Sequence, residues 1–273
     1  MSDLRLETVL RRERIVVGVA LTILAAAAWL YLLHLSGTME ADDDAMPGMP
    51  GMPAMSAVAM PGSEALHWID LGALTGMWAV MMVAMMTPAA APMIATFAAV
   101  HRRRPATGRV AVPTITFVLG YLAVWTGFSV LTAIAQAWLH SKALLSAAMA
   151  PTTPLLGGAL LIATGIYQWT PLKRACLRLC RSPLSFFTTH WREGRRGAVV
   201  MGLYHGLYCL GCCWALMALL FAAGVMNLVW VAFLAVAVLV EKVAPHGELV
   251  GRFAGLVLFV AGVVLMSRGL TTS

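Results

Sequence analysis

Seven long apolar stretches divide this chain, and they constrain its fold more than any other feature of the sequence. They cover about residues 15–35, 71–100, 112–139, 154–169, 198–221, 226–243 and 249–266, and the fourth and sixth are the shortest. A helix needs about 17–25 apolar residues to cross the hydrocarbon core of a bilayer. Inside lipid the backbone must satisfy its own hydrogen bonds, which favours helices for such stretches. The sequence therefore predicts an all-α, polytopic transmembrane helix bundle with about seven spans.

Composition and charge agree with a membrane setting. Hydrophobic residues make up 60% of the chain and charged residues 11%, which is far from the average soluble domain. In a seven-span arrangement, all of the 19 lysines and arginines except Lys142 and Arg268 fall on one side. Since positive charge stays on the cytoplasmic side, we expect the amino terminus inside and the carboxy terminus outside. This asymmetry explains the net charge of +7 without nucleic-acid binding, and it favours a multi-pass protein of the bacterial inner membrane.

Four segments are expected along the chain. Residues 1–35 form a cytoplasmic amino terminus and an anchor helix. The apolar run in this first segment is too long for a signal peptide and lacks a clean cleavage site, so we expect it to be retained. An outward-facing acidic loop rich in Met, Pro and Gly follows at 36–70, then a metal-binding transmembrane domain at 71–267 and a short tail at 268–273.

The densest group of chemically reactive side chains lies in the fifth apolar stretch. His205, Cys209 and Cys212 have the spacing i, i+4 and i+7, which places an imidazole and two thiols on one helix face, with Cys213 beside them. Thiols and imidazole together select soft or borderline metals such as Cu(I) and Zn(II). The pattern predicts a metal site inside the bundle.

Methionines repeat every third residue in the outward-facing loop. The row consists of Met46, Met49, Met52 and Met55, separated by Pro and Gly. Polyproline II has three residues per turn, so this row would lie on one side of such a helix. Thioethers are soft ligands that form no disulfides in an oxidising compartment, which favours capture of Cu(I) outside the membrane. The alternative is a low-complexity linker without a metal role.

A second group of methionines occupies the second apolar stretch. Met77, Met81 and Met85 form one helical stripe, and Met82 and Met86 form an adjacent one. At 1.5 Å per residue, these side chains and the cysteines of the fifth stretch lie at a similar depth, near the bilayer centre. We expect the two groups to face each other across a shared soft-metal site. Core packing is the alternative, because methionine also fills irregular gaps.

The remaining polar residues are expected to have lesser roles. Cys176 and Cys180 lie four apart in the main inner loop and would share a face if that segment is helical; reduced thiols are their default, and a ligand pair is the alternative. We expect Glu241 and Lys242 at the inner interface, where long charged side chains reach water. The sequence further suggests that Gln136 lies near an outer helix end, that Asn227 caps a helix, and that most histidines outside the fifth stretch are solvated, namely His101, His140, His190 and His246.

Several of these strings together resemble the predicted metal-binding integral membrane proteins of domain of unknown function 2182. The resemblance covers roughly residues 71–243. It rests on Ala84-Met85-Met86-x-Pro88 with Pro92, Tyr167-Gln168-x-x-Pro171-Leu172-Lys173 with Cys176, Cys180-Arg181-x-Pro183, Cys209-x-Gly211-Cys212-Cys213-Trp214-Ala215-Leu216-Met217, Gly224-x-Met226-Asn227 and Glu241-Lys242. The resemblance implies metal binding in a membrane and copper handling.

Three classes of function are consistent with these features. The leading one is a membrane protein that captures Cu(I) at the Met-rich loop and passes it to the Met/His/Cys site as a chaperone, relay or transporter, with a metal-donor or metal-acceptor protein as partner. Cu(I) fits better than zinc because a closed zinc site would not need the methionines. The second is a membrane thiol-disulfide oxidoreductase using Cys209 and Cys212. The third is an assembly or scaffold subunit. The sequence offers no catalytic constellation, which favours a binding protein over an enzyme.

Overall fold

The computed structural model describes residues 2–44, 68–102, 111–142, 153–225 and 227–271, and these residues form helices joined by short turns. No strand occurs among them, so the predicted all-α fold is confirmed for this part of the chain. The helices are α1 (Ser2–Asp44), α2 (Trp68–Arg102), α3 (Ala111–Ser141), α4 (Pro154–Tyr167), α5 (Pro171–Arg181), α6 (Pro183–His190), α7 (Gly194–Ala218), α8 (Leu220–Ala223), α9 (Leu228–Val243) and α10 (Gly247–Thr271).

Five helical segments are long and apolar enough to cross a membrane. They are Ile15–Gly37, Leu71–Arg102, Val112–Ser141, Gly194–Ala223 and Gly247–Gly269. The helices α4 and α5 form a sixth candidate if they are taken together, although they are bent by 65° at their junction. With 16 residues, α9 is about 24 Å long and shorter than the hydrocarbon core of about 30 Å. Five or six spans are therefore supported, and the predicted count of seven and the orientation stay predictions.

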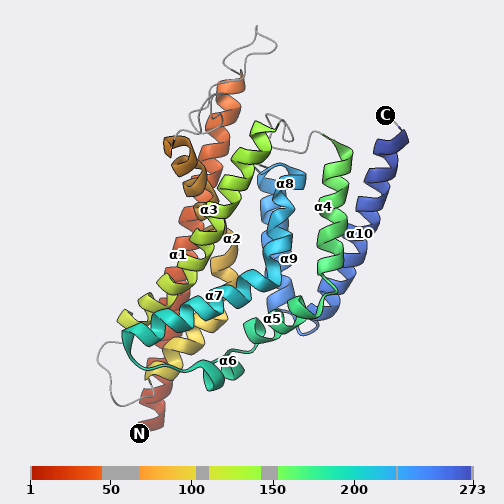
Figure 1. Cartoon of the computed structure of the whole chain (residues 1–273). Helices are drawn as coiled ribbons and strands as arrows, with labels where there is room; N and C mark the ends of the chain where they lie inside the picture. Colours follow the sequence, from red (N-terminus) through yellow and green to blue (C-terminus); the bar gives the residue numbers. More distant parts are fainter. Residues whose placement is uncertain (1, 45–67, 103–110, 143–152, 226, 272–273) are drawn as a thin grey trace.

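The helices form two groups with α9 between them. Figure 1 shows α1, α2 and α3 on one flank and the pair α4 and α10 on the other, with α9 between them. The helix α7 packs along α3, and α5 packs against α7. Both α5 and α6 lie at the end of the bundle where α1 begins (Figure 1).

Glycines allow α3 and α7 to approach closely. A Cβ atom at Gly120 of α3 would collide with the carbonyl oxygen of Val199 in α7, and one at Gly202 of α7 would collide with that of Phe117 in α3. Small residues at such crossings let two backbones meet, which is the usual way that helices pack in membranes. This contact brings Tyr121 of α3 next to the cysteine-bearing turn of α7.

The turn between α4 and α5 directs α5 back toward α7. Thr170 caps α5 by accepting a hydrogen bond from the backbone N–H of Lys173 at 3.3 Å, and Pro171 occupies the first helical position. The segment that carries Cys176 and Cys180, which the sequence predicts as the main inner loop, is therefore helical. Its buried face consists of Lys173, Leu177 and Cys180.

Several polar residues are more buried in the protein than the sequence suggests. Gln136 lies near the end of α3 as predicted, but it is only 3% exposed, and His101 is equally buried, so the expectation of solvated histidines is wrong for His101. Gln136 accepts a hydrogen bond of 2.6 Å from the Trp78 indole, and His101 stacks on Phe97. His140 and His190 are half-buried and His246 is exposed. Asn227 caps α9 as predicted, by accepting a hydrogen bond from the backbone of Trp230.

Candidate metal centre

The helix α7 carries three cysteines on one buried turn. Cys209, Cys212 and Cys213 are each no more than 1% exposed. The thiols of Cys212 and Cys213 both donate to the carbonyl oxygen of Cys209, at 3.0 and 2.9 Å. All three cysteines are free thiols, so a concentrated group of sulfur ligands lies in the protein interior.

Methionine side chains of α2 lie in the same core. Met81, Met82, Met85 and Met86 are each no more than 2% exposed. Met86 is the one placed against a thiol, because its Sδ atom lies 4.0 Å from the Sγ atom of Cys213. Metal–sulfur bonds of about 2.3 Å allow a shared ion between sulfurs up to about 4.6 Å apart. A thioether and a thiol from different helices therefore stand at a distance that one ion can bridge.

The two cysteines of α5 join this group. The Cys180 side chain is 9% exposed and interacts with the thiols of Cys209 and Cys212, and the Cys176 sulfur lies against Gly211 of α7. We expected Cys176 and Cys180 to be reduced thiols of the main inner loop, with a ligand pair as the alternative. The bend between α4 and α5 instead places them beside the cysteines of α7, so all five cysteines of the chain lie along one helix contact. We call these residues the cysteine cluster.

Lys242 of α9 points into the cysteine cluster. Its Nζ atom donates to the Cys209 sulfur at 2.8 Å, and its side chain is only 7% exposed. The prediction that Lys242 reaches water at the interface is therefore wrong. A signal was present in the sequence, because a charged residue at the end of an apolar stretch is costly and is most often functional when it faces the bundle interior.

Tyr121 is a second residue that the sequence reasoning missed. Its hydroxyl lies 3.2 Å from the Cys209 sulfur and also donates to the backbone carbonyl of Met86 at 3.2 Å. It thereby connects α3, α2 and α7 at one point. No local sequence pattern marks this tyrosine, since its role depends on the close packing of α3 against α7.

Glu241 is also buried, contrary to the prediction from sequence, and it is paired. Its carboxylate lies 2.5 Å from the Lys173 ammonium, and both side chains are less than 5% exposed. Lys173 also donates to the side-chain oxygen of Gln168. A side chain at Gly251 of α10 would collide with the Glu241 carboxylate. This ion pair therefore joins α5 and α9 beside the cysteine cluster and requires a glycine in α10.

His205 lies one helical turn from Cys209 but packs among aromatic rings. Its imidazole stacks on Tyr121 and Phe117 with ring centroids 5.3 and 6.1 Å away. Both ring nitrogens are buried without a hydrogen-bond partner, which is costly for a polar group. Within the described residues, no group of three His, Cys, Asp or Glu side chains is arranged to hold one ion.

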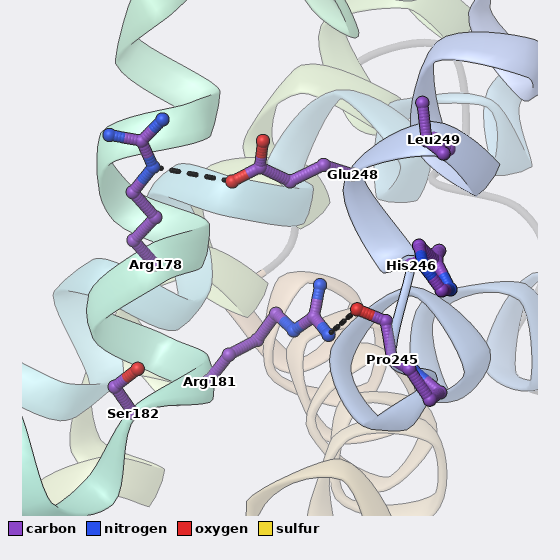
Figure 2. A pocket seen from close by; sticks show the side chains of 7 residues that line it. All are labelled: Arg178, Arg181, Ser182, Pro245, His246, Glu248 and Leu249. Atoms are coloured by element: carbon purple, nitrogen blue, oxygen red, sulfur yellow. Dashed lines mark hydrogen bonds and ion pairs between the residues drawn. The ribbon is translucent and has the colours of Figure 1, made fainter.

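A pocket of about 450 Å³ lies between α5 and the start of α10 (Figure 2). Across it, Arg178 pairs with Glu248 of α10 at 3.2 Å, and Arg181 donates to the carbonyl oxygens of Ala244 and, at 3.1 Å, Pro245. This ion pair and these hydrogen bonds connect α5 to the link between α9 and α10 and to the start of α10. They hold the helix in the position that brings Cys180 to α7.

Most of the Met-rich loop falls outside the part of the chain that the structure describes. Met46, Met49, Met52 and Met55 lie outside the described residues, so the proposed row of thioethers stays a prediction.

One family of known proteins has a model that matches this chain. The family model described as "PpoB2: Copper chaperone" matches residues 75–265. The matched range includes most of α2 and α10 and every cysteine of the chain. Neither the curated proteins nor the solved structures yield a match.

Proposed function

Because this chain belongs to the PpoB2 copper chaperone family, we propose that it is an integral membrane protein that binds Cu(I) and hands it on, as a chaperone, relay or transporter. The family is copper-related, in agreement with the function implied by the resemblance to domain of unknown function 2182, although its name is a different one. A metal ion as partner and copper as the associated metal follow from the family; the oxidation state and the site are our proposals.

The observation that carries the proposal is the gathering of soft ligands from three helices. Thiols from α5 and α7 meet a thioether from α2, where Cys213 and Met86 lie 4.0 Å apart. Cu(I) favours thiolate and thioether sulfur, whereas zinc sites rarely use thioethers. This ligand set supports Cu(I) over zinc.

The direction that we propose is from the outer loop to the inner end of the bundle. Cu(I) is captured by Met46, Met49, Met52 and Met55, reaches the thioethers of α2 and is then bound by the cysteine cluster. Ligands change from thioether to thiolate along this path, and thiolate is the stronger donor because it carries charge. Successive sites of rising affinity would draw the ion inward. An acceptor protein would then collect it from the inner side of the bacterial inner membrane.

Metal analysis of purified protein tests this proposal. The full chain is purified in detergent under reducing conditions, incubated with Cu(I) and freed of unbound metal before copper per chain is measured. We expect the variant Cys209→Ser/Cys212→Ser to lose most of the bound copper, and a deletion of residues 46–60 to lose part of it. Leu256→Ala, at an exposed position of α10, serves as the control. Full copper content in both variants would overturn the proposal.

One contact also favours the thiol-disulfide oxidoreductase as a second candidate. The Lys242 ammonium lies 2.8 Å from the Cys209 sulfur, and a cation beside a thiol favours the reactive thiolate. If this candidate holds, exposure of the protein to an oxidised quinone should protect Cys209 and Cys212 from alkylation. Unchanged alkylation would exclude it.

A further inference from the structure

We infer that Lys242 is a fixed counter-charge that makes the cysteine cluster selective for a monovalent ion. The inference rests on the proposed function, because it concerns the ion preference of the same site. It adds a specificity-determining residue that provides no ligand itself.

The charges around the cluster are unequal in number. Among the described residues, two buried lysines, Lys173 and Lys242, accompany one buried carboxylate, that of Glu241. The carboxylate is already paired with Lys173 at 2.5 Å. Lys242 instead lies against the Cys209 sulfur at 2.8 Å.

Most of the remaining groups that act on Lys242 are thiols, and the Glu241 carboxylate, which also interacts with it, is paired with Lys173. The Lys242 ammonium interacts electrostatically with the thiols of Cys180, Cys212 and Cys213. The Tyr121 hydroxyl shares the Cys209 sulfur with it. A charge buried in a medium of low dielectric constant must be balanced nearby, and the Glu241 carboxylate is already paired with Lys173.

Charge balance then distinguishes the metals. When Cu(I) binds two cysteine side chains as thiolates, any proton that they carry leaves to solvent, and two thiolates, one Cu(I) and one ammonium sum to zero. A divalent ion bound by the same two thiolates leaves one positive charge without compensation. Because an unpaired buried charge is costly, Lys242 favours Cu(I) and disfavours Zn(II).

Removal of the charge at position 242 tests the inference. Lys242→Met keeps most of the side-chain volume without the charge, and Lys242→Arg keeps the charge. Lys142→Met removes a lysine from an exposed position and serves as the matched control. The affinities for Cu(I) and for Zn(II) are measured separately by competition with chromophoric chelators, on full-length protein in detergent.

We expect Lys242→Met to lower the ratio of Cu(I) to Zn(II) affinity by about tenfold or more, where tenfold corresponds to about 1.4 kcal/mol. Lys242→Arg and Lys142→Met should keep the ratio of the wild type. If Lys242→Met does not elute as a single species, Lys242→Gln replaces it, since the amide still donates to Cys209 without carrying a charge.

The outcomes separate the two proposals. An unchanged affinity ratio in the neutral variants, in a protein whose copper binding depends on Cys209 and Cys212, overturns this inference alone. A loss of selectivity in Lys242→Arg equal to that in Lys242→Met also overturns it, because packing and not charge would then be responsible. Copper binding that is independent of both cysteines overturns the proposed function itself.

Discussion

At the scale of single residues, buried charge distinguishes the surroundings of the cysteine cluster from a packed apolar core. Lys173, Glu241 and Lys242 are 2, 3 and 7% exposed. Buried ions are costly to remove from water, and a pair of them contributes less to stability than its short distance suggests. Their presence is therefore better explained by what they position than by the stability that they add. Lys173 and Glu241 hold α5 against α9, and Lys242 holds Cys209.

Breaking the buried pair should cost far more than breaking an exposed pair on the same helix. We expect Lys173→Met to lower the stability of the protein by about 3–5 kcal/mol, because it leaves the Glu241 carboxylate buried and without its main partner. Arg178 pairs with Glu248, but its side chain is 70% exposed, so Arg178→Met should cost at most about 1 kcal/mol. Thermal unfolding of both variants in detergent measures the difference. Equal melting temperatures would contradict this view of the Lys173–Glu241 pair.

At the scale of helices, close contacts between backbones determine which side chains meet. The helices α3 and α7 approach at Gly120 and Gly202, and this approach brings the Tyr121 hydroxyl to 3.2 Å from the Cys209 sulfur. The bend of 65° between α4 and α5 has a similar effect, because it turns Cys180 toward α7. The cluster therefore depends on helix crossings as much as on its own residues.

A pair of glycine substitutions tests the contact between α3 and α7. In Gly202→Ala, the new methyl group meets the carbonyl oxygen of Phe117, and overpacking of this kind costs about 1–3 kcal/mol. In Gly127→Ala, also within a helix, no atom lies within 4 Å of the new methyl group. This change should be neutral or stabilising by about 0.5–1 kcal/mol, since alanine is the better helix former. We expect only Gly202→Ala to lower the melting temperature, and the reverse order would contradict the close approach.

At the scale of the whole molecule, the arrangement of the helices agrees with an odd number of crossings. The helix α1 begins and α10 ends at opposite ends of the bundle (Figure 1). Five segments qualify as spans on their own. In addition, α9 runs between α2 and α10 in the middle of the bundle. These neighbours cover only one side of α9, because Val229, Phe233 and Val236 on its other side are exposed, so α9 stays a predicted span.

Reporter fusions in a bacterial host test the topology. We expect alkaline phosphatase, which is active only outside the cytoplasm, to be active when fused after residue 271 and inactive when fused after residue 102. A fluorescent protein that folds only in the cytoplasm should give the opposite result at each position. The lysine and arginine distribution is the physical reason, because positive loops resist translocation. Activity of phosphatase at both positions would contradict the seven-span arrangement.

The sequence by itself determined the long apolar helices and the chemical character of the site, whereas it left α5 conditional and did not indicate α6. Apolar length and helical periodicity are local properties, so the helical segments, the buried face with Cys209 and Cys212, and the cap at Asn227 could be read directly from the chain. The choice of soft ligands is likewise local, because it depends on residue type.

Tertiary structure alone decided which residues meet at the cluster and which polar groups are buried. Cys180 reaches Cys209 because α5 turns back at Thr170, and Lys242 reaches the same sulfur from a helix 33 residues further along the chain. No local pattern states to which side the flexible stem of a lysine at a helix end will point. Its direction depends on where the nearest acceptor lies, and in this protein helix packing places that acceptor, the Cys209 sulfur, in the interior.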